Sequence, residues 1–182
     1  MQHKINPGSI GFVMHHDNFI SKIISKAMSS KWSHCFYVWG KCNETIVLAE
    51  TTDFEVTKST IEKYNKKSCS LEIWEPIPKH DSLKMAKDGQ YLEGIVYGYL
   101  QLISLGVRRL LKKFSFKISN FFRQGAVCTA VPIAHSNKQP NISCLYNLDP
   151  ESIDTEELHQ LIKNSGEYRL VFKKEKDELW QD

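Results

Sequence analysis

The chain has 182 residues, of which 41% are hydrophobic, 25% charged and 11% aromatic. This length favours one domain with one main core, and this composition excludes collagen, a coiled coil and a fully disordered chain. The formal net charge is +3, which is smaller than the basic excess typical of a dedicated nucleic-acid binder. We therefore expect one globular domain over residues 1–182 that binds no nucleic acid.

The five cysteines do not have the spacing of a metal site or of a disulfide framework. Their number is odd, and no two of them are spaced Cys-x-x-Cys. The first residues lack the apolar core of a signal peptide, and no apolar run is long enough for a membrane-spanning helix. These features predict a cytoplasmic protein with free thiols.

The first half of the chain carries strand patterns. They occur at residues 8–14, 32–39, 45–51 and 69–74. Residues 32–39 and 45–51 are separated by a short turn and predict a hairpin. A helix is expected between the first two strands, at residues 19–27, and a short one at residues 59–64, where Ser59 and Glu62 have the spacing of a capping box.

The second half is mainly helical by the same criteria. Helical patterns occur at about residues 81–91, 95–122, from 126 onward, and 154–163, and a last strand is predicted at 168–173. This organisation of strands first, helices after and one strand last predicts the α+β fold class.

Three residues form a candidate catalytic site. Cys128 lies where a loop gives way to an apolar helix, and the positive end of a helix lowers the pKa of a thiol. His34, in a strand, has the chemistry of a general base, and Glu50 ends the neighbouring strand, about 4.8 Å away, where a carboxylate can orient the imidazole. Taken one at a time, each has a commoner interpretation: a core thiol, a structural histidine and a solvated glutamate.

The order of these motifs resembles a known superfamily. The chain carries Gly-Ser-Ile-Gly-Phe-Val at residues 8–13, Ser-His at 33–34, Leu-Ala-Glu at 48–50, Gly-Ile-Val-Tyr-Gly-Tyr at 94–99 and Cys-Thr-Ala-Val at 128–131. This series is similar to the permuted papain-like superfamily of NlpC-type cysteine hydrolases, in particular its YiiX-like branch. The resemblance implies a circularly permuted papain-like fold, in which an antiparallel sheet or barrel packs against helices, with a helical insertion at about residues 101–124.

The resemblance also implies roles for the three candidate residues. Cys128 is the nucleophile, His34 the base and Glu50 the residue that orients the base, while the backbone N–H of Cys128 meets the oxyanion. The expected function is an amidase or peptidase that works through an acyl-enzyme, without cofactor or metal, on a peptide, cell-wall or lipid-linked acyl substrate. Two alternatives stay open: a lipid acyltransferase, thioesterase or phospholipase of the same superfamily, and a non-catalytic binding module.

Two other groups of residues have side chains of the kind found in binding sites. His15, His16 and His135 lack the spacing of metal ligands, so we expect no metal site. A basic segment combines Leu and Phe with five cations, namely Arg108, Arg109, Lys112, Lys113 and Lys117. It fits either a surface that binds an anionic membrane or an amphipathic helix with a solvated basic face.

Overall fold

The computed structural model describes residues 5–27, 29–52, 55–77, 80–96, 128–149 and 153–180, and an antiparallel sheet lies at its centre. The six strands are β1 (Ile10–His15), β2 (His34–Cys42), β3 (Thr45–Thr51), β4 (Val56–Thr60), β5 (Cys69–Pro76) and β6 (Tyr168–Lys174). Their order is β4-β3-β2-β1-β5-β6, and every neighbouring pair is antiparallel. Together with the helices, this sheet confirms the α+β class.

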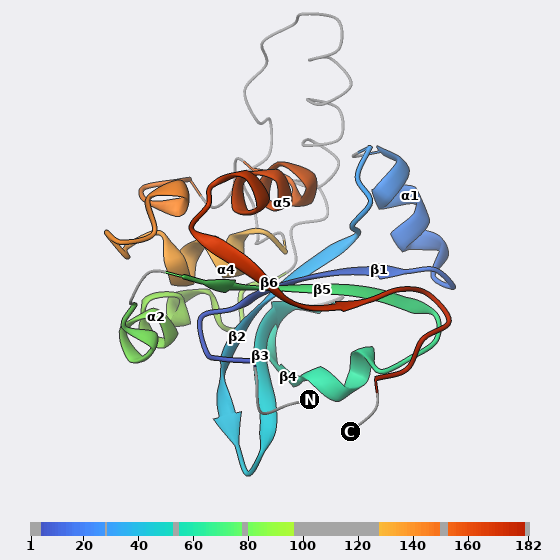
Figure 1. Cartoon of the computed structure of the whole chain (residues 1–182), viewed down its shortest axis with the longest axis horizontal. Helices are drawn as coiled ribbons and strands as arrows, with labels where there is room; N and C mark the ends of the chain where they lie inside the picture. The colour runs from blue at the N-terminus through green and yellow to red at the C-terminus, as the bar shows by residue number, and fades with distance from the viewer. Residues whose placement is uncertain are drawn as a thin grey trace, which may run out of the picture.

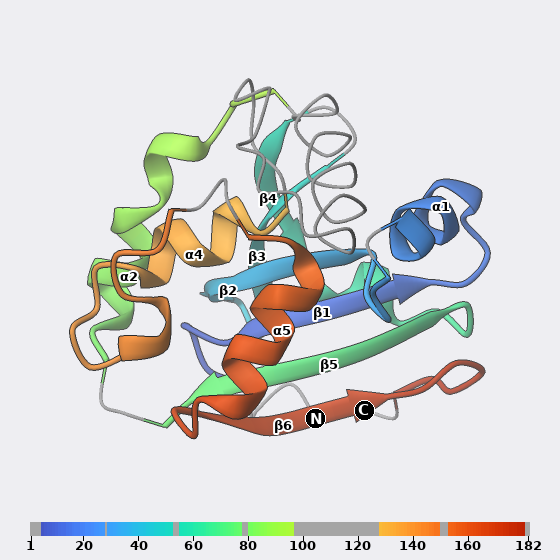
Figure 2. The same cartoon turned by 90° about the horizontal axis from the view of Figure 1, so that it is seen from above.

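The helices lie mainly on one side of the sheet (Figures 1 and 2). They are α1 (Phe19–Ala27), α2 (Ser82–Asp88), α4 (Ala130–Ser136) and α5 (Thr155–Asn164), with the 3-10 helices η2 (Ile61–Tyr64), η3 (Gln90–Leu92) and η4 (Ser143–Leu145). Helix α4 packs on β2 and β3, and α2 packs against α4. No helix in this described part of the chain is both long and apolar enough to cross a membrane.

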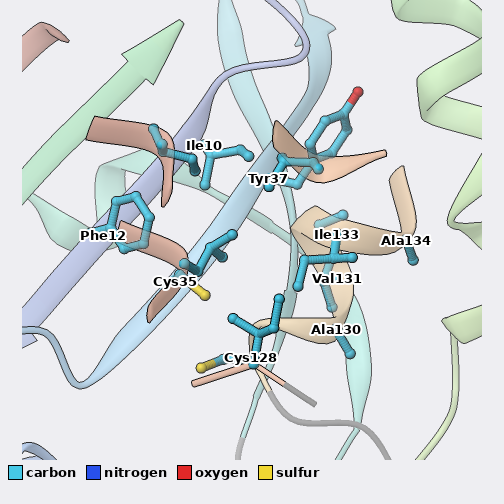
Figure 3. Packing of buried hydrophobic residues seen from close by; sticks show 14 of the residues in the cluster. Ile10, Phe12, Cys35, Tyr37, Cys128, Ala130, Val131, Ile133 and Ala134 are labelled. Carbon is cyan, nitrogen blue, oxygen red and sulfur yellow. The ribbon is translucent and has the colours of Figure 1, made fainter. Parts of the chain in front are cut away.

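Alternation along the strands gives the sheet two apolar faces. Cys35 and Tyr37 point into the core beneath the helices, where α4 is buried along its whole length (Figure 3). Phe36 and Val38 point into a second core on the opposite face, which η2 and the C-terminal Trp180 help to cover. Because successive side chains in a strand face opposite ways, β2 contributes to both cores at once.

A close contact between β1 and β2 depends on a glycine. Gly11 is the register partner of Phe36, and a Cβ at Gly11 would lie 2.0 Å from the Phe36 ring. The missing side chain lets Phe36 lie against β1 and stack on Tyr64, with 5.3 Å between ring centroids. This packing fixes the first residues of β2, where His34 is located.

Some sequence-based expectations need correction. Ser59 does not cap a helix: it lies in β4, η2 begins only at Ile61, and the N-cap Thr60 makes no side-chain capping bond. The helix expected at residues 81–91 ends at Asp88 and is followed by η3. Most of the helical pattern at residues 95–122, including the insertion expected at 101–124, lies outside the described residues.

Candidate active site

The β2–β3 pairing brings His34 and Glu50 together. Tyr37 is the register partner of Ala49, so one further step along the ladder places Glu50 opposite Phe36, on the face that also carries His34. The resulting diagonal pair is close enough for the side chains to meet. His34 Nε2 lies 2.7 Å from Glu50 Oε2, and the Glu50 side chain is fully buried.

Three further side chains hold the Glu50 carboxylate. The hydroxyls of Ser59 and Tyr64 donate hydrogen bonds to it, and Lys63 Nζ lies 2.5 Å from Oε1. Burial opposes the charge of Glu50, but the hydrogen bond and charge of His34, aided by Lys63, outweigh burial and lower its pKa to about 2. Glu50 is therefore a buried anion at neutral pH, rather than the solvated strand-end charge that its position in the sequence first indicates.

Cys128 lies in the turn that leads into α4. The helix itself begins at Ala130, so Pro132 falls in its first turn, where a missing N–H breaks no helical hydrogen bond. The Thr129 hydroxyl donates to the carbonyl of Ile153, 2.7 Å away, and so ties this turn to the residues that precede α5. Both the proline and this tether set the position of the Cys128 thiol.

Side chains from two separate elements, β2 and α5, surround the Cys128 thiol. His34 and Cys35 approach it from β2, and Thr155 Oγ1 at the start of α5 lies 3.4 Å from Sγ. The hydrogen bond from Cys35 lowers the pKa of Cys128, whereas burial raises it. The hydrogen bond and charge of His34 lower this pKa further, and so does the hydrogen bond from Thr155. The pKa of Cys128 is thereby held well below the ordinary value, and these donors explain the shift without recourse to the short helix α4.

The pKa of His34 is shifted in the opposite direction to that of Cys128. Burial disfavours its charged form, but hydrogen bonds with Cys128 and Glu50, and the charges of both, raise its pKa to about 9. Since Nε2 faces Glu50, Nδ1 is the ring nitrogen left for the thiol. The lowered cysteine pKa and the raised histidine pKa both favour the thiolate–imidazolium form of the pair.

A second histidine–glutamate pair connects helix α5, which carries Thr155, to the sheet. His159 lies one turn beyond Thr155 on α5, and its Nε2 is 3.0 Å from Glu72 Oε2 on β5. The rings of Phe12 and Trp32 pack against His159, with centroids 4.9 Å and 5.4 Å away. This contact fixes α5 on the sheet, and Thr155 with it.

The histidines weighed as metal ligands make other contacts. His135 Nδ1 lies 2.5 Å from the carbonyl oxygen of Met85, and its ring stacks on Tyr37. His15 contacts the Cys69 sulfur, and His16 contacts Ser70. Within the described ranges, no group of three or more His, Cys, Asp or Glu residues is placed to hold a metal ion. The basic segment that contains Arg108, Arg109, Lys112, Lys113 and Lys117 lies outside those ranges.

The sequence predicted Cys128, His34 and Glu50 as candidates but not the residues around them. Cys35, Ser59, Lys63, Tyr64 and Thr155 all contact Cys128 or Glu50. None of the five carried a sequence signal for this site, and Ser59 was predicted instead to cap a helix. No protein-family model and no curated protein sequence gives a match to this chain.

Proposed function

We propose that this protein is a cysteine hydrolase that cleaves an amide bond through an acyl-enzyme on Cys128. The observation that carries the proposal is the 2.7 Å pair of His34 with the buried carboxylate of Glu50, next to a Cys128 thiol whose pKa is lowered by Cys35 and by His34. A nucleophile, a base within reach of it and a third group that orients the base are the parts required for acyl transfer.

The reaction follows from the charges of these groups. The Cys128 thiolate attacks the carbonyl carbon of the substrate, and the backbone N–H of Cys128 is the candidate donor to the oxyanion. Protonated His34 gives its proton to the leaving amine, which leaves an acyl group on the sulfur. Neutral His34 then takes a proton from water as the water attacks this thioester, and the acid and the free thiol are released.

Within this proposal, the fold is a circularly permuted papain-like domain. Its base precedes its nucleophile in the chain, and an antiparallel sheet carrying His34 packs against α4, the helix that follows Cys128. Both features support the permuted arrangement that the ordered motifs predict. The substrates that fit this assignment are peptide and cell-wall amides.

Acylation of the protein by 4-nitrophenyl acetate tests the chemistry without a known substrate. We expect intact-mass analysis to detect one rapidly formed acetyl adduct, and peptide mapping to place it on Cys128. Cys128→Ala should abolish the rapid adduct, while Cys42→Ala, which removes an exposed thiol, should leave it unchanged. A rapid adduct on another cysteine, or its absence, would argue against the hydrolase and in favour of a non-catalytic binding module.

One observation favours a second candidate function, an acyltransferase or hydrolase that acts on lipids. Helix α1 exposes Phe19 and Ile23, with exposed fractions of 74% and 51%, beside the exposed Lys22 and Lys26. These four positions lie on one side of the helix, because they are spaced by three and four residues. An apolar and cationic helix surface of this kind suits the interface of an anionic membrane.

Vesicle co-sedimentation distinguishes the two candidates. If the substrate is a lipid, vesicles that contain phosphatidylglycerol should bind the protein more strongly than phosphatidylcholine vesicles. Phe19→Ser together with Ile23→Ser should then reduce binding, and added salt should weaken it. Absence of binding to phosphatidylglycerol vesicles at low salt would leave the amide hydrolase as the remaining catalytic assignment.

A further inference from the structure

Cys35 is a second thiol beside the nucleophile, and the proposed hydrolysis does not use its redox chemistry. All five cysteines are free, and Cys35 and Cys128 are both buried in the same core, with exposed fractions of 0% and 4%. Figure 3 shows the sulfur of Cys35 directed toward Cys128. Each thiol also affects the other: Cys35 lowers the pKa of Cys128, and burial together with Cys128 raises the pKa of Cys35.

The other three thiols have different surroundings. Cys42 is exposed at the far end of β2, Cys69 lies against His15, and Cys144 lies beside Glu167. Cys35 is therefore the thiol placed to react with a modified Cys128.

We propose that Cys35 and Cys128 form a reversible disulfide when a peroxide oxidises the nucleophile, and that this bond switches the site off and protects it. The proposal goes beyond hydrolysis and does not require it. It needs only a thiolate at Cys128 and a thiol in contact with it.

The chemistry proceeds in two balanced steps. The Cys128 thiolate attacks one oxygen of hydrogen peroxide, the O–O bond breaks, and hydroxide leaves, so that the sulfur is oxidised to sulfenic acid. The Cys35 sulfur then attacks the Cys128 sulfur, the S–O bond breaks, and the departing hydroxide leaves as water with the Cys35 proton. Two thiols and one peroxide yield one disulfide and two waters, and a dithiol reductant reverses the change.

The surroundings of the two sulfurs assign them different parts in this reaction. Peroxide selects Cys128, because the thiolate is the nucleophilic form. Burial, together with the adjacent negative charge of Cys128, raises the pKa of the Cys35 thiol well above its ordinary value. Oxidation of Cys128 to a neutral sulfenic acid removes that negative charge, so the Cys35 thiol loses its proton more easily as it attacks the Cys128 sulfur.

Peroxide treatment of the full chain, followed by mass spectrometry under non-reducing conditions, tests the proposal. We expect the wild type to lose the mass of two hydrogen atoms and to yield a linked peptide pair containing Cys35 and Cys128. Dithiothreitol should then restore labelling of Cys128 by iodoacetamide. Loss of the free Cys128 thiol without the linked pair would overturn the proposal, and this readout needs no variant.

Variants test whether Cys35 protects Cys128 from further oxidation or only lies near it. In the Cys35→Ala variant, peroxide should oxidise Cys128 further, to the sulfinic or sulfonic acid. Dithiothreitol should then fail to restore labelling of Cys128. The matched control Cys144→Ala should behave like the wild type. Full recovery of labelling in a folded Cys35→Ala protein would also overturn the proposal. These experiments measure labelling of Cys128 rather than turnover, so their outcome does not depend on whether the hydrolase assignment is correct.

Discussion

Replacing Glu50 by glutamine tests whether a buried carboxylate holds His34 in its charged form. Ser59 donates to Oε1 and Tyr64 to Oε2 of Glu50, so the single amide oxygen of glutamine can accept a hydrogen bond from only one of them, and the negative charge facing His34 and Lys63 is lost. The pKa of Glu50 is lowered from 4.5 to about 2, which corresponds to about 3 kcal/mol of folding stability. Breaking a buried ion pair costs a similar ~3–5 kcal/mol.

We therefore expect Glu50→Gln to lower the free energy of unfolding by about 3 kcal/mol at neutral pH. A carboxylate whose pKa is lowered by folding contributes this stability above its unfolded pKa and loses it as the pH falls through the folded value. The difference in the free energy of unfolding between wild type and variant should therefore be largest above pH 4.5 and should decrease as the pH falls toward about 2.

The same substitution should change the titration of His34. In the wild type its pKa is raised to about 9, so its contribution to stability is full below pH 6.5 and is lost as the pH rises through about 9. Without the Glu50 charge, the pKa of His34 should fall and this alkaline loss should shrink. The pKa of Cys128 should rise, because its imidazolium partner is less populated.

Two assays measure these effects. Urea unfolding followed by tryptophan fluorescence over a pH series gives the stability difference, and the rate of iodoacetamide alkylation against pH gives the thiolate titration. Glu55→Gln, at an exposed position before β4, is the matched control. If Glu50→Gln leaves both pH profiles equal to those of Glu55→Gln, the buried ion pair does not tune the site and the reasoning is refuted.

Three further outcomes follow from the contacts of the thiol. His34→Ala should raise the Cys128 pKa toward about 8.5, measured by the ultraviolet absorbance of the thiolate; an unchanged titration would contradict the ion pair. Thr155→Val should raise the Cys128 pKa less than His34→Ala does, as measured by the pH dependence of alkylation; a larger rise would mean that Thr155 is the main donor. Limiting iodoacetamide at mildly acidic pH should label Cys128 ahead of Cys42 and Cys144 in peptide maps, whereas equal labelling would exclude a depressed pKa.

Local sequence patterns predicted most of the regular structure. Strand alternation and apolar runs located five of the six strands, and helical spacing located α1 and α5, where Asp154 and Glu157 form a capping box. The weakest prediction concerned Ser59, whose spacing from Glu62 mimics a cap. Its hydroxyl bonds to the buried carboxylate of Glu50 instead, because a charged acceptor one strand away is a stronger partner than a local backbone N–H.

The sequence alone determined which residue types are available to the site and the order in which they occur. The pairing of the hairpin strands, which is local in the chain, was enough to predict that His34 and Glu50 meet. The environment of Cys128 was decided only by the tertiary structure. Cys35 and Thr155 come from a strand and a helix that are distant from Cys128 in the chain and converge because α4 and α5 bury their apolar faces on the same side of the sheet. Burial is non-directional and leaves no spacing signal, so the donors that set the pKa of the thiol are visible only in the folded protein.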